Sequence, residues 1–342
     1  FKLVHIFSRS ELIEVATFRS GEDETNEGNL VTDQSGKILR DNIWGSLEQD
    51  TFRRDFTINA LYYCPISGKI EDHNSGIAHI QNKKIVSIGD PMKRFSEDPV
   101  RSLRAIRFSN KLNFKIDKNV KDAIYKKGYL LENISNARLF DEFCKIFLSG
   151  IAEKNFNKLV SFNLNKYLIL TNPNSSEFSQ NLIKEALINT DKRVKNDQSV
   201  TPGFLIAAML WPEVLKRSRG DKEINLRKFF RSMDQILRNQ QTITAIPRKF
   251  HSYIKDIWVL QLKLHSRIGK QPYKTSKHPR FRAAYDFLLI REKASKCKSN
   301  LGDWWTKFQK NNSASQKQQI LNLKEVDSEN SFKKFGFQEE LI

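Results

Sequence analysis

The chain of 342 residues has few of the features that mark secreted or membrane-spanning proteins. Its three cysteines, Cys64, Cys144 and Cys297, lie far apart and lack the paired spacing of a metal site. This pattern indicates buried thiols in a reducing cytoplasm. The longest apolar runs, such as 204–211, are far shorter than the roughly 20 residues that a bilayer span requires. The first residues do not resemble a secretory signal, so we expect a cytoplasmic protein with no membrane partner.

Acidic residues are also scarce, because 39 Asp and Glu against 58 Lys and Arg leave a formal net charge of +19. Such a surface favours polyanions, and nucleic acid is the commonest soluble one. A Lys-rich and Asn-rich composition imposed by an AT-rich genome would give the same excess. Charge alone therefore leaves RNA, DNA and an anionic membrane open. The 39% hydrophobic content is that of an ordinary globular protein, and the length suits two or three packed units.

The first 88 residues predict a mixture of strands and short helices. Two β-rich runs at 3–7 and 11–18, separated by a polar turn, predict a hairpin. The polar stretch 20–37 predicts an exposed loop. A short apolar helix is expected at 58–63, followed by a strand, a turn and a second strand over 64–70.

From Pro91 onward the apolar residues recur at helical spacing. Residues 100–112 present one apolar face, and further helices are expected at 118–131 and 138–148. A last packed helix is expected around Trp304 and Trp305. The tail beyond Asn311 is rich in polar residues, which predicts a loosely ordered segment.

The densest polar cluster lies at 53–60. Its charged and amide members are Arg53, Arg54, Asp55 and Asn59. Arginine supplies planar bidentate donors to phosphate, and the start of a helix adds backbone N–H groups. The alternative is that Asp55 or Thr57 caps the short helix while the other side chains face solvent. Composition alone does not separate these two interpretations.

A second cluster lies at 96–108. Pro99 fits the first position of a helix, which makes Asp98 its natural N-cap and Glu97 a neighbour that complements the helix dipole. Capping does not explain three arginines at three-residue spacing, which are Arg101, Arg104 and Arg107. Because Asp98 and Arg101 lie one turn apart, a carboxylate acceptor and a guanidinium donor could together contact the edge of a base. Capping alone remains the alternative.

A third candidate is Glu14, inside the second strand of the expected hairpin. A carboxylate in an alternating strand commonly faces solvent. Phosphoryl transfer to a hydroxyl, however, uses carboxylates to hold two metal ions roughly 3.5 to 4 Å apart. Glu14 is a candidate member of such a set.

Taken in this order, the clusters resemble the bacterial poly(A) polymerase and tRNA CCA-adding enzyme family of nucleotidyltransferases. The matching features are Glu14 in its strand and the segments 53–60, 72–76, 97–108 and 138–142. Three later segments, 196–211, 255–258 and 281–286, resemble the poly(A) polymerase branch. The similarity covers almost the whole chain. One departure lies at 76–80, where relatives usually carry an acidic residue followed by Leu.

The resemblance implies an α+β, palm-like nucleotidyltransferase sheet domain, incomplete here, followed by an all-α neck and body. The implied parts are 1–88 for the catalytic domain, 89–150 for a helical neck that binds base and RNA, 151–310 for a helical RNA-binding body, and 311–342 for a basic tail. Family members carry a Gly-rich strand–turn–helix and an Asp-x-Asp pair ahead of the point where this chain starts with Phe1. We therefore expect a fragment of a longer protein or an inactive product.

The implied activity is template-independent addition of AMP from ATP to RNA 3′ ends, with Mg²⁺ or Mn²⁺ as cofactor and RNA-decay machinery as a partner. Glu14 would be a catalytic carboxylate and metal ligand, and Asp55 a further active-site acid. Arg53, Arg54 and Asn59 would hold the ribose and triphosphate, and Asp98 with Arg101 would contact the base. Arg104 would be a nucleotide-binding residue. Together with Arg138 and Glu142, it would also brace the neck helices. The alternatives are a tRNA CCA-adding enzyme and an inactive RNA-binding relative.

Overall fold

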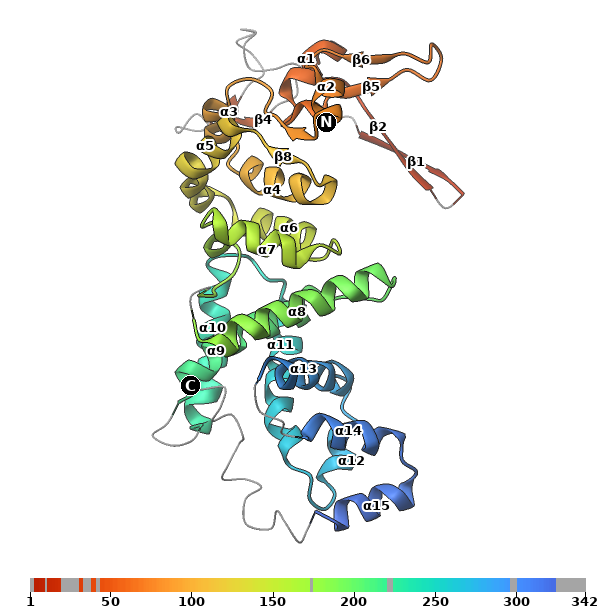
Figure 1. The fold of residues 1–342 in the computed structure, drawn as a ribbon, viewed down its shortest axis with the longest axis vertical. Coiled ribbons are helices and arrows are strands. Elements are labelled where there is room, and N and C mark those ends of the chain that lie inside the picture. Colours follow the sequence, from red (N-terminus) through yellow and green to blue (C-terminus); the bar gives the residue numbers. More distant parts are fainter. Residues whose placement is uncertain are drawn as a thin grey trace. The chain divides into compact units, whose positions relative to one another are not determined.

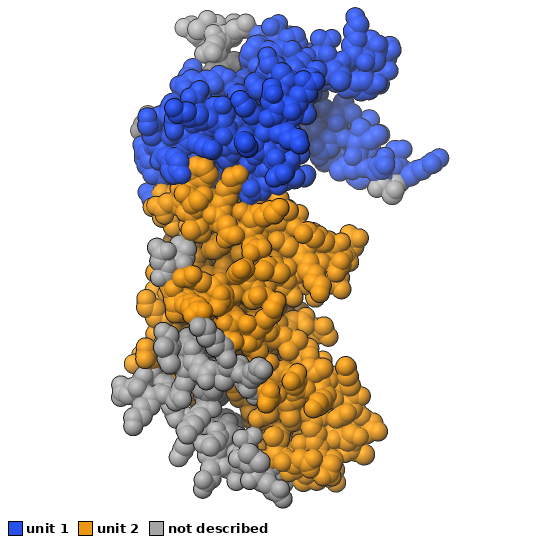
Figure 2. All heavy atoms as spheres, viewed as in Figure 1, with its two compact units in different colours: residues 1–133 blue, residues 134–342 orange. Residues whose placement is uncertain are grey.

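The computed structural model describes residues 3–9, 11–19, 31–32, 38–40, 44–172, 175–219, 224–295 and 300–323. They belong to two compact units, residues 1–133 and residues 134–342, each of which is described by itself (Figures 1 and 2). The four-part division implied by the resemblance remains a prediction. No helix in these ranges combines the length and apolarity needed to cross a membrane.

The described residues of the first unit form four two-stranded sheets and short helices. Its strands pair as β1 (Leu3–Ser8) with β2 (Glu11–Ala16), β3 (Val31–Thr32) with β4 (Ile38–Arg40), β5 (Leu61–Tyr63) with β6 (Ile70–Asp72), and β7 (Lys84–Ile85) with β8 (Lys115–Ile116). Its helices are α1 (Leu47–Arg53), α2 (Gly76–Gln81), α3 (Pro91–Glu97), α4 (Val100–Leu112) and α5 (Lys118–Lys127), with 3₁₀ turns η1 (Thr57–Asn59) and η2 (Gly128–Asn133). Of the strand pairs that the structure describes, only β7 and β8 run parallel.

The expected hairpin is confirmed as β1 and β2, which pair antiparallel. The cross-strand pairs Val4–Val15 and Ile6–Ile13 place four aliphatic side chains on one face. The pair His5–Glu14 lies on the other face. Every residue of the two strands is exposed, so no described residue buries the aliphatic face.

The prediction of a helix at 58–63 is wrong. Only the short 3₁₀ turn η1 forms, and the chain then enters β5, which pairs with β6 across a turn where Gly68 has a φ of +66°. The two tyrosines of β5 are good strand formers, so pairing across this turn outweighs the apolar helical pattern. The loop expected at 20–37 falls mainly outside the described residues, but β3 within it is a strand rather than a loop.

The later helical predictions are largely confirmed. The runs 100–112, 118–131 and 138–148 correspond to α4, to α5 with η2, and to α6 (Asn136–Phe147). Helix α4 begins one residue later than expected, with Pro99 as its N-cap residue. The carboxylate of Asp98 nevertheless accepts a hydrogen bond from the Val100 amide at 3.2 Å, so the expected capping contact forms.

The second unit is built of helices. After α6 these are α7 (Ala152–Ser161), α8 (Glu177–Lys195), α9 (Pro202–Ser218), α10 (Leu226–Gln241), α11 (Arg248–His265), α12 (Gln271–Ser276), α13 (Phe281–Ala294), α14 (Leu301–Lys310) and α15 (Ser313–Leu321), with η3 (Asn165–Tyr167) after α7. Helix α14 confirms the expected helix at Trp304 and Trp305, and Trp305 donates to the Leu264 carbonyl at 2.9 Å. Helix α15 shows that residues 313–321 are ordered, against expectation. Cys64 and Cys144 are free thiols, while Cys297 lies outside the described residues.

Gly76 stands where the first unit has no room for a side chain. A Cβ added there would lie 2.5 Å from the Thr57 carbonyl oxygen. The Asp72 carboxylate accepts hydrogen bonds from the amides of Gly76 at 2.8 Å and Ile77 at 2.9 Å, which caps the start of α2. Burial raises the pKa of Asp72, but these bonds and one from the Asn74 amide together outweigh it, so the pKa lies below its usual value. Helix α2 is therefore held close to η1.

Replacing Gly76 with Ala should destabilise the protein by about 2–3 kcal/mol, because the new methyl group meets a backbone carbonyl rather than a flexible side chain. The free energy of unfolding in urea measures the loss. Ala78→Ser, at an exposed position of the same helix, is the control and should change it by less than about 0.5 kcal/mol. Equal losses in the two variants would contradict this account of Gly76.

The core of the second unit contains a buried arginine. Arg291 is 2% exposed, donates to Gln261 Oε1 at 2.9 Å, and stacks over the ring of Trp211 at 4.9 Å from the ring centroid. Gln261 in turn donates to the Ala284 carbonyl at 3.0 Å. Burial, together with the charges of Arg291 and Arg267, lowers the pKa of His265 to about 3. His265 is therefore neutral at physiological pH.

The neutral state of His265 predicts a pH dependence of stability. Below about pH 6.5 the unfolded chain takes up a proton that folded His265 does not accept until about pH 3. The free energy of unfolding should therefore fall by about 1–2 kcal/mol more in the natural protein than in His265→Leu between pH 7 and pH 5. Urea titrations at the two pH values measure this difference. Parallel pH profiles would show that His265 titrates normally in the folded protein.

Candidate functional site

A cavity of about 310 Å³ opens in the first unit where the end of β2 approaches α1. It is lined by Ala16, Thr17, Phe18, Arg19, Asp50, Arg53, Arg54 and Tyr62. Helix α1 is fixed at its start by a capping box, in which Ser46 and Gln49 each bond the other's backbone amide. The last turn of α1 thus presents its arginines at a defined place in the cavity wall.

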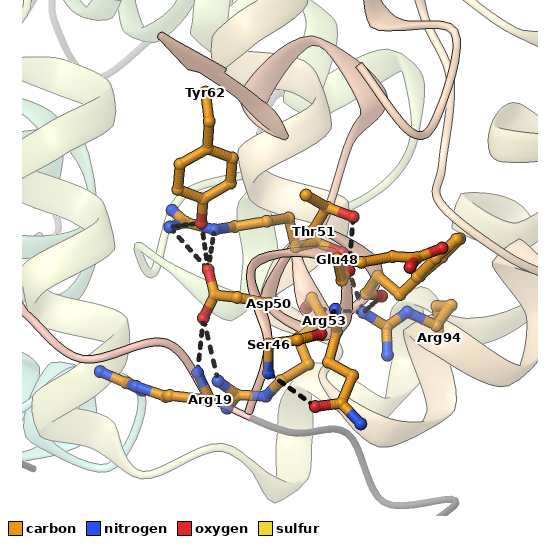
Figure 3. Close-up of polar contacts among 11 residues, drawn as sticks. Arg19, Ser46, Glu48, Asp50, Thr51, Arg53, Tyr62 and Arg94 are labelled. Atoms are coloured by element: carbon orange, nitrogen blue, oxygen red, sulfur yellow. Dashed lines mark hydrogen bonds and ion pairs between the residues drawn. The ribbon is translucent and has the colours of Figure 1, made fainter. Parts of the chain in front are cut away.

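Asp50 is the centre of the polar contacts in this cavity (Figure 3). Its carboxylate is 6% exposed and accepts hydrogen bonds from Arg54 Nη2 at 3.0 Å, from the Arg19 amide at 3.2 Å and from the Tyr62 hydroxyl. Arg53 Nη1 lies 3.7 Å from the Oδ1 atom of Asp50. One buried carboxylate therefore orients the charged side chains of α1, the Tyr62 phenol and the chain at Arg19.

The cavity holds more positive than negative charge. Burial, followed by repulsion from Arg19, Arg54, Arg94 and Arg101, lowers the pKa of Arg53 to about 10. Asp50 alone does not balance this group. An anion that enters the cavity would relieve the repulsion, and arginine forks suit phosphate oxygens in particular.

Arg94 of α3 holds the C-terminal end of α1. Its Nη2 atom lies 2.7 Å from the carbonyl oxygen of Arg53, 2.9 Å from that of Arg54 and 3.4 Å from that of Phe52. These carbonyls have no partner within the helix and carry its negative dipole end, so a cation there is stabilising. Nη1 of the same guanidinium donates to Glu97 at 2.9 Å.

Asp55 follows α1 and is buried at 6% exposure. It accepts hydrogen bonds from Arg104 Nε at 2.5 Å, from Asn59 Nδ2 at 3.0 Å and from the Phe56 amide at 2.9 Å. The structure therefore brings the predicted residues Asp55, Asn59 and Arg104 together, with Asp55 anchoring the segment to α4. The catalytic role expected for Asp55 remains a prediction.

Arg101, predicted to contact a base, lies beside this network. Its Nη1 donates to the Arg94 carbonyl at 3.1 Å and lies 3.5 Å from Glu97 Oε2, and its side chain is 12% exposed. Burial, followed by repulsion from Arg94, lowers its pKa. Arg101 is thus held at its outer end by groups of α3, the helix that also caps α1.

Glu14 stands apart from these residues. It lies opposite His5 in the hairpin, 3.6 Å from His5 Nε2, and its side chain is 62% exposed. Asp55 already bonds Arg104 and Asn59 with its two oxygens. The described residues contain no cluster of three or more His, Cys, Asp or Glu side chains that would suit a metal ion. They do not fit a two-metal set, so we derive no step through a metal.

Arg138 and Glu142 lie on α6, in the second unit. Glu142 is 3% exposed and accepts from Lys145 Nζ at 2.8 Å, whereas Arg138 is exposed. Their expected role in bracing the neck helices remains a prediction.

The sequence did not single out four residues of the network, which are Arg19, Asp50, Tyr62 and Arg94. Asp50 could have been found, because it lies three and four residues before Arg53 and Arg54 on a helix. The fold brings Arg19 and Tyr62 to the cavity and Arg94 to the end of α1, and no spacing relative to Arg53 and Arg54 marks these three in the sequence.

Three family models match successive parts of the chain. They are described as the Poly A polymerase head domain for residues 1–86, the probable RNA and SrmB-binding site of polymerase A for 113–178, and the polymerase A arginine-rich C-terminus for 222–335. Poly(A) polymerase I of Salmonella typhi is 38% identical over 323 residues, which cover 90% of this chain and 69% of that protein. The chain belongs to the poly(A) polymerase I family. The resemblance drawn from the ordered motifs is thereby confirmed.

Other relatives agree with this assignment. Poly(A) polymerase I of Escherichia coli O6:H1 is 37% identical over 96% of this chain and 73% of its own length. A CCA-adding enzyme of Lactococcus lactis is 29% identical over 65% of this chain and 50% of its own length. Among solved structures, a tRNA nucleotidyltransferase complexed with a primer tRNA and an incoming ATP analog has a TM-score of 0.60 at 18% identity, covering 90% of this chain and 80% of that one. This likeness confirms the predicted fold class, a nucleotidyltransferase sheet region followed by a helical body.

The stability of this site should depend on the ion pair between Arg104 and Asp55. Arg104→Ala leaves the buried Asp55 carboxylate without its guanidinium partner, which should lower the free energy of unfolding by about 2–4 kcal/mol. Urea unfolding measures the loss. Lys111→Ala, exposed on the same helix, should change little. In the double variant Arg104→Ala, Asp55→Asn, part of the stability should return, and a purely additive loss would argue against the ion pair.

Proposed function

We propose that this protein adds AMP from ATP to RNA 3′ ends without a template. The observation that carries the proposal is the 37–38% identity to poly(A) polymerase I along 90% or more of the chain. The cationic cavity around Asp50 supports it, because a triphosphate is the kind of ligand that several partly buried arginines favour.

The arginine cluster would contribute to the chemistry by positioning and by charge neutralisation. In phosphoryl transfer the protein mainly aligns the attacking and leaving oxygens and stabilises charge on the phosphates. Arg53, Arg54 and Arg19 would contact the triphosphate from the cavity wall. Asn59, held by Asp55, would face the ribose.

Recognition of the base would fall to Asp98 and Arg101, whose carboxylate and guanidinium can accept from and donate to a base edge. Protein groups would then replace a template strand, which explains template independence. Mg²⁺ or Mn²⁺ belongs to this proposal as the cofactor, and Glu14 would be one of its ligands, but the described residues do not form the metal site by themselves.

The RNA strand would be bound through phosphate contacts by a chain of net charge +19. Cytoplasmic location and association with RNA-decay machinery complete the proposal. A CCA-adding activity is the second candidate, supported by relatives that are 29–31% identical over 58–65% of the chain. Supplying CTP and ATP with a tRNA that lacks its CCA end distinguishes the two, since sustained addition of A to unrelated RNA excludes CCA addition.

Arg101→Ala should relax the preference for ATP. A good bidentate base contact gives roughly 1–3 kcal/mol of discrimination, so the ratio of ATP to CTP affinity should fall about tenfold. Equilibrium titration of the chain with each of the four nucleoside triphosphates measures the ratio, and RNA extension by the longest natural reading frame that contains this chain measures its consequence. An equal loss of affinity for all four nucleotides would rule out a base contact by Arg101.

A further inference from the structure

Arg94 bonds in two directions with one guanidinium. Its Nη2 atom serves the carbonyls at the end of α1, at 2.7 Å for Arg53 and 2.9 Å for Arg54. Its Nη1 atom donates to Glu97 at 2.9 Å. The side chain of Arg94 is 18% exposed and that of Glu97 is 23% exposed, so the ion pair is partly shielded from water.

The two sets of bonds connect Arg94 to two arginines, Arg53 and Arg101, that have different expected roles. On one side, Arg94 fixes the backbone of Arg53, whose side chain lines the cavity. On the other, Glu97 Oε2 lies 2.9 Å from Arg94 Nη1 and 3.5 Å from Arg101 Nη1. Arg101 also donates to the backbone carbonyl of Arg94 at 3.1 Å.

An arginine is required for this arrangement. The guanidinium is planar and carries donors at two separated nitrogen atoms, whereas the lysine ammonium is a single point of charge. A lysine at position 94 could neutralise the end of α1 or bond Glu97. It could not hold the geometry of both bonds at once.

We propose that Arg94 is a positioning residue that sets Arg53 and Arg101 together and so couples the phosphate end of the nucleotide site to its base end. This inference rests on the proposed function, because it assumes that the Arg53 cavity binds a polyphosphate and that Arg101 meets the base. Arg94 itself touches neither part of the nucleotide.

The test uses two ligands that separate the two ends. Inorganic tripolyphosphate reports the phosphate end, and the ratio of ATP to CTP affinity reports the base end. Affinities are measured by equilibrium titration of the purified chain. Circular dichroism and thermal melting are recorded for each variant, so that titrations are made where the protein is folded.

Arg94→Met should lose both properties, with tripolyphosphate affinity about tenfold weaker and the ATP to CTP ratio reduced toward one. Glu97→Gln removes only the ion pairs that link Arg94 to Arg101. The ratio of ATP to CTP affinity should therefore fall, while the affinity for tripolyphosphate should change by less than about twofold. Combining the two substitutions should lower the ratio no further than Arg94→Met alone. Arg94→Lys should have a melting temperature close to that of the natural protein, while its ratio of ATP to CTP affinity should stay well below the natural value. Lys93→Gln, at an exposed neighbouring position, is the charge-matched control and should leave both properties unchanged.

The outcomes separate the inference from the proposed function. If the natural chain binds both ligands and Arg94→Met, while folded, changes neither, the inference about Arg94 is overturned and the nucleotide site stands. A uniform loss for all ligands that simply follows the unfolded fraction also overturns it. Additive effects of Arg94→Met and Glu97→Gln on the ratio would show that the two residues act separately. If the natural chain binds neither ATP nor tripolyphosphate, the nucleotide site fails, and the coupling fails with it.

Discussion

The first unit depends on how the C-terminal end of α1 is neutralised. A helix that ends inside a protein leaves carbonyl groups without partners, and leaving them unsatisfied costs free energy. Arg94 satisfies these carbonyls from α3. The chain can then turn sharply into the buried segment at Asp55, where Arg104 of α4 provides the second attachment. Both contacts join residues some forty positions apart or more, so the site exists only when α1, α3 and α4 are packed together.

The parts of the fold that sequence patterns predicted are those that local rules govern. Periodic apolar residues correctly predicted α4, α5 and α6, and a polar turn between β-rich runs predicted the hairpin. The helix expected at 58–63 failed because strand pairing between β5 and β6, a contact across a turn, outweighed the local pattern. Arg53 and Arg54 were chosen for their chemistry. Their partner Asp50 lies one helical turn away, where local spacing could have identified it, whereas Arg94 meets α1 only through a tertiary contact.

The two units place charge inside the protein in different ways. In the first, partly exposed arginines meet carboxylates or carbonyl oxygens around a cavity, and a surplus of positive charge remains. In the second, Arg291 meets a neutral amide and the face of an indole, within a closed core. The first arrangement is ready to exchange its contacts for those of an anion. The second stabilises the packing of α9, α11 and α13 against one another.

The β1–β2 hairpin has a consequence for how an active protein is assembled. Its face of Val4, Ile6, Ile13 and Val15 is exposed, and an isolated pair of strands is marginal in water. Glu14 lies on the opposite face of the same pair. A layer packed against the aliphatic face would therefore also fix the position and direction of this carboxylate. Packing against the aliphatic face and orientation of Glu14 are thus linked through the backbone of one pair of strands.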